Sequence, residues 1–229
     1  ARTSDVPLFD NKSFAYDGIA DYVDIGNPTS LQITSVMTLS AWFKTSSTDT
    51  QMIIGKDNIT SNRSYLLYHS NGVGLRFLIF KGGNNFELVT ATSTITDGQW
   101  HHVMGVNDGT DLKIYVDGVL EGTNIGGGGS IHNGSSDFFI GKREGNNGLY
   151  FSFWDGSIND ISVFNTDESS NASTIYNGGI VNDISNLNPL SYWRSEFATW
   201  DGSNWTMIDQ GSGANNGTSV SMPLTSRTS

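Results

Sequence analysis

The chain has 229 residues, a length that a single β-sandwich or barrel can fill, and it combines 27 glycines with only 4 prolines. Its 12 basic and 23 acidic side chains give a formal net charge of −11 at pH 7, which argues against nucleic acid and anionic membranes as partners. The absence of cysteine excludes disulfides and thiolate chemistry, and no segment approaches the roughly 20 apolar residues needed to cross a bilayer.

Apolar residues alternate with a period of two at several places, and this period predicts strands. Leu39, Ala41 and Phe43 alternate with other residues in the segment 39–44. In residues 73–80 both faces carry large apolar side chains. Such a pattern is typical of a central strand in a two-sheet sandwich, with one face on the core and the other on a partly covered concave surface.

A hairpin is predicted further along the chain. Residues 99–106 and 112–116 again alternate, and the second run directs Leu112, Ile114 and Val116 inward. Asp117-Gly118 follows at once and is the preferred pair for a two-residue type I′ turn, because both positions need a positive φ.

The remaining elements are shorter. Four glycines at 126–129 predict a loop before a strand at 138–141, and residues 158–164 alternate as a further strand. Only residues 168–176 have a helical pattern, of one or two turns. The segment after Gly178-Gly179 contains too few apolar residues for a core of its own, so we expect it to dock on the main sandwich.

Three motifs carry a family resemblance, and they occur in order between about residues 14 and 176. They are residues 14–26 (FAYDG…DYVDIG) followed by 39–44 (LSAWFK), residues 97–103 (DGQWHHV) followed by 112–118 (LKIYVDG), and residues 139–141 (FIG) followed by 153–161 (FWDGSINDI). Together they resemble the laminin G-like branch of the concanavalin A-like lectin/glucanase superfamily. The resemblance implies an all-β fold, a two-sheet antiparallel jelly-roll sandwich that spans residues 1–229 as one domain.

The order of the motifs differs from the family in one respect. Tyr192-Trp193 and residues 209–218 (DQGSGANNGT) resemble the opening strand and polar loop of family members, but here they stand near the C-terminus. We expect residues 183–222 to fold back and complete the sandwich, because the termini of sandwiches often lie close together. The alternative is one register of a tandem array.

The Thr/Ser/Asn-rich style of the chain resembles modules of marine bacteriophage virion and tail-fibre proteins and of secreted bacterial proteins. The resemblance implies a non-enzymatic recognition module on a virion surface or outside the cell, with a glycan or surface polysaccharide as its partner. The alternative is an architectural decoration or spacer domain that contacts other virion or surface proteins. Both readings rest on analogy of fold.

Related sandwiches often carry one structural calcium ion near the strand that corresponds to residues 158–161. The resemblance therefore implies a calcium site at Asp160, with Asn159, Asp21 or a loop carbonyl as further oxygen ligands. Alternatively, Asp160 accepts hydrogen bonds from a turn and binds no metal.

A glycan site is expected where aromatic faces and polar side chains meet on a concave surface. The candidate ligand-binding residues are Trp42, Tyr65, Tyr68, Arg76, Phe80 and Trp154. The alternative for each aromatic residue is a place in the core, because most aromatic side chains of a β-sandwich are buried.

No catalytic residue is expected. Hydrolases of related fold carry two glutamates on one strand, whereas the five glutamates of this chain are isolated in the sequence. His101 and His102 are adjacent on a predicted strand, so their side chains point to opposite faces and cannot bind one ion. We expect one of them to be packed and the other to lie at the surface.

Overall fold

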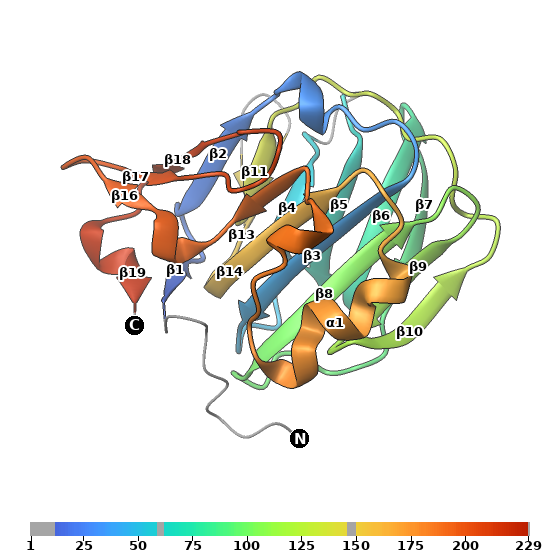
Figure 1. The fold of residues 1–229 in the computed structure, drawn as a ribbon, viewed down its shortest axis with the longest axis horizontal. Coiled ribbons are helices and arrows are strands. Elements are labelled where there is room, and N and C mark those ends of the chain that lie inside the picture. The colour runs from blue at the N-terminus through green and yellow to red at the C-terminus, as the bar shows by residue number, and fades with distance from the viewer. Residues whose placement is uncertain (1–11, 59–61, 146–149, 229) are drawn as a thin grey trace.

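The computed structural model describes residues 12–58, 62–145 and 150–228. They form two antiparallel sheets packed face to face (Figure 1). Sheet A contains, in spatial order, β10 (Val119–Asn124), β9 (Leu112–Val116), β8 (Trp100–Asn107), β3 (Met37–Lys44), β14 (Asp155–Phe164), β1 (Ser13–Asp17) and β19 (Arg227–Thr228), and β15 (Ser191–Trp193) also pairs with β14. Sheet B contains β16 (Thr199–Trp200), β17 (Trp205–Met207), β18 (Gly217–Val220), β2 (Tyr22–Gly26), β11 (Phe138–Ile140), β4 (Gln51–Lys56), β5 (Tyr65–Ser70), β6 (Gly74–Gly82) and β7 (Asn85–Thr90). The predicted all-β jelly-roll sandwich is confirmed.

A short hairpin and a few helical turns complete the fold. The hairpin consists of β12 (Lys142–Glu144) and β13 (Tyr150–Phe153), and the helix α1 spans Ala172–Tyr176. Single 3-10 turns lie at Thr29–Leu31, Ser169–Asn171, Asn177–Gly179, Ser185–Leu187, Ser195–Phe197 and Leu224–Ser226. No helix in the described ranges is long and apolar enough to cross a membrane.

The main core lies between the two sheets. Leu39, Ala41 and Phe43 of β3 face it from sheet A, as their alternation predicts. The sheets approach closely where Gly105 of β8 meets Phe77 of β6, because a Cβ atom on Gly105 would lie 2.5 Å from the Phe77 ring. Any larger residue at position 105 would therefore push the two sheets apart.

The predicted hairpin is present with its turn chemistry. Asp117 and Gly118 connect β9 to β10 with φ values of 52° and 76°, the positive values that a type I′ turn needs. The predicted helical segment is also present as α1 and its preceding 3-10 turn.

The outer face of sheet A is covered, which the sequence pattern did not indicate. In Figure 1, α1 and the chain that follows it cross in front of β8 and β9. Met104 and Val106 of β8 pack there against Ile175 and Ile184. His101 and His102 do point to opposite faces, but both are buried, with 8% and 1% of their surface exposed. The expectation of one surface histidine is therefore wrong, because the face that should have been open carries a helix.

Strands of the C-terminal segment lie in both sheets. β15 pairs with β14 in sheet A, and β18 pairs with β2 in sheet B. Trp193 of β15 is fully buried in the main core, where its ring lies 5.5 Å from that of Phe138. β19 pairs with β1, so that Ser13 lies opposite Thr228.

Candidate functional site

The outer face of sheet B is largely apolar and carries Arg76, and the Arg63 guanidinium lies over the Phe80 ring of this face at 3.9 Å. Met52, Tyr68, Arg76 and Thr90 stand side by side in register across β4, β5, β6 and β7. Directly opposite residues of neighbouring strands share a face, so these four side chains form one row. This surface, which we call the Arg76 face, comprises Met52, Leu66, Tyr68, Arg76, Leu78, Phe80, Phe86, Leu88 and Thr90.

Arg76 is the polar centre of this face. Its Nη1 lies 3.5 Å from the Tyr68 hydroxyl oxygen, and its Nε is enclosed without a hydrogen-bond partner. Among the described residues, no carboxylate forms an ion pair with this guanidinium. A half-buried arginine that no acid neutralises retains donors for the oxygen atoms of a ligand.

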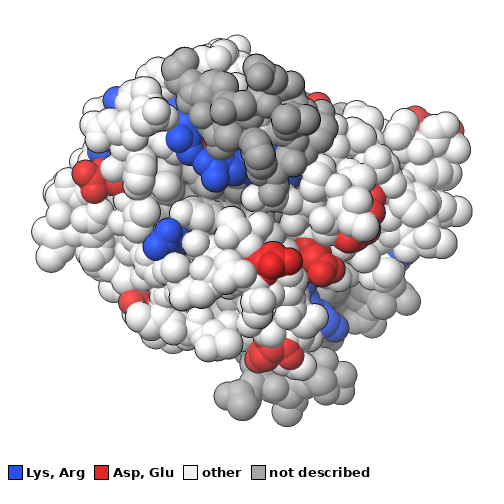
Figure 2. Space-filling model, turned by 180° about the vertical axis from the view of Figure 1, so that it is seen from behind, with Lys and Arg blue, Asp and Glu red and all other residues white. Residues whose placement is uncertain are grey.

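The accessible apolar surface of this face lies at Phe86 and the partly buried Leu88. Leu66, Leu78 and Phe80 are buried and form one cluster, beside which the Phe86 side chain remains 45% exposed. The Phe86 ring meets that of Phe80 nearly edge-on, at 6.0 Å between centroids. Figure 2, which views the molecule from behind, shows white surface on this side, with blue side chains gathered beside the grey residues and several red side chains near one another in the middle of the view. The apolar surface at Phe86 and Leu88 suits the C–H faces of a sugar ring.

The structure brings together three of the six residues expected to bind a ligand. Tyr68, Arg76 and Phe80 share the Arg76 face, where Phe80 is buried and packs in one cluster with Leu66 and Leu78.

The other three do not reach it. Trp42 points to the outer face of sheet A and is stacked under Tyr176, with 5.9 Å between ring centroids. Tyr65 and Trp154 lie in the core, where the Tyr65 hydroxyl donates to the Leu31 carbonyl at 2.7 Å. These three assignments fail because each strand of a covered sandwich can bury aromatic residues on either face.

Next to the Arg76 face lies a set of basic groups that are already engaged. The Asp57 carboxylate holds Arg63 and Arg143, each with its Nε at 2.6 Å. The Lys142 ammonium lies over the Tyr22 ring at 3.6 Å, and burial lowers the pKa of Lys142 to about 8. These cations are neutralised or shielded, in contrast to Arg76.

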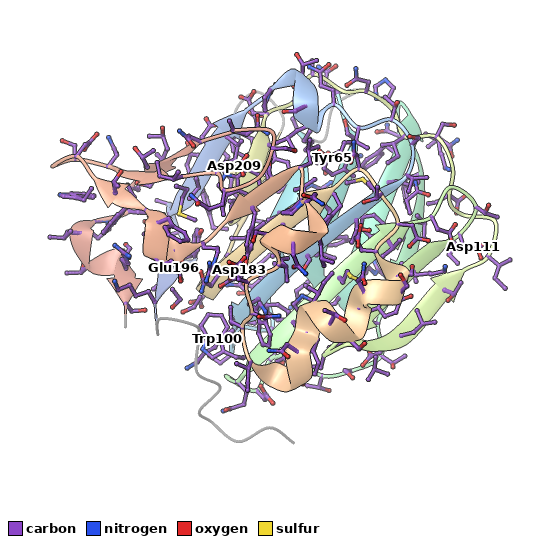
Figure 3. The ribbon with its side chains drawn as sticks, viewed as in Figure 1. Tyr65, Trp100, Asp111, Asp183, Glu196 and Asp209 are labelled. Carbon is purple, nitrogen blue, oxygen red and sulfur yellow. The ribbon has the colours of Figure 1, made fainter. Side chains whose placement is uncertain are left out.

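The residues expected to bind calcium are occupied by protein partners. One Asp160 oxygen accepts a hydrogen bond from the Tyr192 hydroxyl at 3.0 Å and lies 3.3 Å from the Arg194 Nε. The Asn159 side-chain oxygen accepts bonds from the amide and hydroxyl of Ser195, at 3.0 and 2.6 Å. Figure 3 shows two further acids, Asp183 and Glu196, in the same region, and both pair with Arg194.

Asp21 lies elsewhere. It neighbours Asp17, at the opposite end of β1 from the residues that Asn159 contacts, and the length of this strand separates the two places by about 13 Å. Burial and the charge of Asp17 raise the pKa of Asp21 to about 6. Within the described ranges no three acidic or histidine side chains are grouped to hold a metal ion. The expected calcium ligands therefore do not converge, and Arg194 supplies the positive charge beside Asp160.

Two hollows that sequence reasoning missed lie away from the Arg76 face. One, of about 420 Å³, is lined by Asp17, Asp49 and Asp155 among others. The Asp17 carboxylate accepts backbone N–H bonds from residues 19, 20 and 21, and these bonds lower its pKa although partial burial opposes the shift. The Asp17-Gly18 turn is the only local signal that could have pointed to this hollow.

The second hollow, of about 490 Å³, is lined by acidic groups around His101. The two ring nitrogens of His101 lie 2.9 Å from Asp117 and 3.2 Å from Asp97. Burial opposes the charged ring, but the two carboxylates outweigh it and raise the pKa of His101 above its usual value. Asp97 lies four residues before His101, whereas the contact with Asp117 joins β8 to the turn after β9, so no local sequence pattern signals it.

Residues 17–173 match the sequence profile of Laminin_G_3, described as the concanavalin A-like lectin/glucanases superfamily, whereas no curated protein matches the chain. A Bacteroides ovatus protein provisionally named a carbohydrate binding protein has 18% identity and a TM-score of 0.70, and the match covers 93% of this chain and 59% of that one. The CBM40 module of a Ruminococcus gnavus IT-sialidase, bound to α2,3-sialyllactose, has 16% identity and a TM-score of 0.54, with 73% and 97% covered. A Limulus polyphemus SAP-like pentraxin has 21% identity and a TM-score of 0.53, with 72% and 82% covered. At such identities the likeness shows a common fold.

Proposed function

Because the chain belongs to the laminin G-like family of the concanavalin A-like lectin/glucanases superfamily, we propose that it is a non-enzymatic module that binds carbohydrate on the Arg76 face. The observation that supports this proposal most is the half-buried Arg76 guanidinium, which no described acid neutralises, beside the exposed Phe86 and partly buried Leu88. One of the similar structures is named as a carbohydrate binding protein and another is bound to sialyllactose, which favours the same function.

Each part of the face has a role in this proposal. Arg76 donates hydrogen bonds to ring or hydroxyl oxygens of the sugar, and Tyr68 donates or accepts one beside it. Phe86 and Leu88 pack against the C–H face of the same sugar. Because such a face is pre-formed by packed strands, binding orders few side chains and loses little entropy.

The test is a glycan array followed by calorimetry on the best binder. Arg76→Met keeps the length and apolar stem of the side chain and removes its donors, so we expect affinity to fall about 10- to 100-fold, the value of a charged hydrogen bond. Tyr68→Phe should lose less. Lys44→Met removes an exposed charge from sheet A and should bind like the wild type. Equal affinity of Arg76→Met and wild type would contradict the proposal.

The second candidate is the architectural role, which one edge of the molecule favours. Val119 and Leu120 on edge strand β10 are 62% and 49% exposed, and β10 lies against β7, which carries the exposed Phe86. Exposed apolar groups on an edge are typical of protein contacts. Light scattering of the wild type and of a Val119→Lys variant would reveal association through this edge. For either role we propose a location on a virion or outside the cell, an inference that rests on the compositional resemblance described above.

A further inference from the structure

Three functional groups lie where β2 and β4 end and β11 begins. β11 lies between the other two strands, with Phe138 opposite Gly26 of β2 and Phe139 opposite Gly55 of β4. Asn27 follows β2, Asp137 precedes β11 and Lys56 ends β4. The Lys56 ammonium donates to the side-chain oxygen of Asn27. The two outer strands, about 10 Å apart at sheet spacing, are thus bridged by side chains across the strand between them.

Lys56 is buried, which is unusual for a lysine side chain. It is 0% exposed and pairs in register with Tyr65, a core residue on the adjacent strand. Burial lowers the pKa of Lys56 to about 8, against the opposing influence of Asp137. A substantial fraction of this amine is therefore neutral near pH 8, and a neutral, desolvated lysine amine is a nucleophile.

The Asn27 amide is held in one orientation. Its nitrogen donates to the Ser135 carbonyl at 3.3 Å, which turns its oxygen toward Lys56. Gln32 donates a second hydrogen bond to the same oxygen at 3.4 Å. Because Lys56 is the attacking group, Gln32 is the donor that is placed to stabilise negative charge on this oxygen during attack.

Asp137 supplies an acid and base next to this pair. Its carboxyl is close enough to Lys56 for their charges to interact, and burial together with Asp24 raises the pKa of Asp137. A carboxyl that holds a proton more readily than usual can give one to a leaving amine and take one from an attacking amine.

We propose that Lys56 and Asn27 join in an intramolecular isopeptide bond, with Asp137 as the proton carrier. The Nζ lone pair attacks Asn27 Cγ, the Cγ–Nδ2 bond breaks, and its electron pair leaves with Nδ2. Asp137 protonates the departing nitrogen and receives a proton from Nζ, so the carboxyl returns to its starting state. The products are one secondary amide and one ammonia, and no oxidant, reductant or metal is consumed.

The bond would fasten β2 to β4 across β11. It involves none of the residues of the Arg76 face, so it is independent of carbohydrate binding. The fixed proximity of the Lys56 amine and the Asn27 amide accounts for their reactivity, because two groups held in contact react as if they were at very high concentration.

Intact-mass spectrometry of the full chain tests the proposal. We expect the folded wild type to be lighter than its sequence mass by one ammonia, and proteolysis to yield a branched peptide that joins the segments around Asn27 and Lys56. Lys56→Arg and Asn27→Ala should have their full sequence masses. Asp137→Asn should keep its full sequence mass or lose ammonia more slowly than the wild type. Any wild-type molecules that have not reacted should lose ammonia after refolding near pH 8.

Lys142→Met is the matched control, because Lys142 is equally buried and has a similar pKa but lies over aromatic rings. This variant should show the same loss of ammonia as the wild type. A wild type at full sequence mass overturns the proposal, whether or not the variants fold. A loss that persists in Lys56→Arg also overturns it, since it would then come from cyclisation at an Asn-Gly pair such as Asn71-Gly72.

Discussion

Replacement of Arg194 by Met should destabilise the fold, because it removes a buried cation that pairs with the buried Asp160 carboxylate. The side chains of Arg194 and Asp160 are 4% and 5% exposed, and the Arg194 Nε lies 3.3 Å from an Asp160 oxygen that also accepts a hydrogen bond from the Tyr192 hydroxyl at 3.0 Å. Removal of one partner of a buried pair costs about 3–5 kcal/mol. For a chain of this size, about 2–4 °C of melting temperature corresponds to each kcal/mol, so we expect a fall of about 6–20 °C.

The double variant Asp160→Asn/Arg194→Met separates charge from packing. Asn tolerates the φ of +46° at position 160 and carries no charge, so the double variant should recover more than half of the loss. Circular-dichroism melts at equal pH and salt provide the measurement. The reasoning is refuted if Arg194→Met melts within about 2 °C of the wild type, or if the double variant melts no higher than Arg194→Met. If a calcium ion held Asp160 instead, excess chelator would lower the melting temperature of the wild type, and we expect no such change.

Two further predictions concern other buried groups. Because the pKa of His101 is raised in the folded state, its ion pairs with Asp117 and Asp97 stabilise the fold fully below the unfolded pKa of about 6.5 and are lost as pH rises through the folded value. Melts across about pH 6 to 8.5 should show this decline and Asp117→Asn should flatten it, whereas an NMR titration of His101 below 6.5 would contradict it. Trp193→Ala should cost about 3–5 kcal/mol in urea unfolding, and Trp200→Ala, at a partly exposed site, should cost less; equal costs would show that Trp193 is not a core residue.

The strands and the hairpin could be predicted because their causes are local. A period of two needs only neighbouring residues, and the turn at Asp117-Gly118 needs only two positive φ values. The candidate site could be predicted in part. Tyr68 and Arg76 share a face because both lie on strands whose alternation is regular, so their positions follow from register.

Other site residues depend on contacts between distant parts of the chain. Trp42 is buried because α1 and Val181 cover a face that would otherwise be open, and nothing in residues 39–44 signals that cover. Asp160 meets Arg194 across 34 positions of sequence, through the pairing of β14 with β15. A local pattern can identify a carboxylate that needs a cation, but it cannot say whether the cation is a metal ion or an arginine from a later strand.

The pairing of β1 with β19 makes the described fold nearly circular. The Ser13 and Thr228 hydroxyls are 3.2 Å apart, so a short peptide could connect the two strands without crossing either sheet. If β19 and β1 were joined in this way and the chain were opened instead at the turn between β9 and β10, every strand of both sheets would keep its neighbours. The order of the strands along the chain would then change while the sandwich stayed the same.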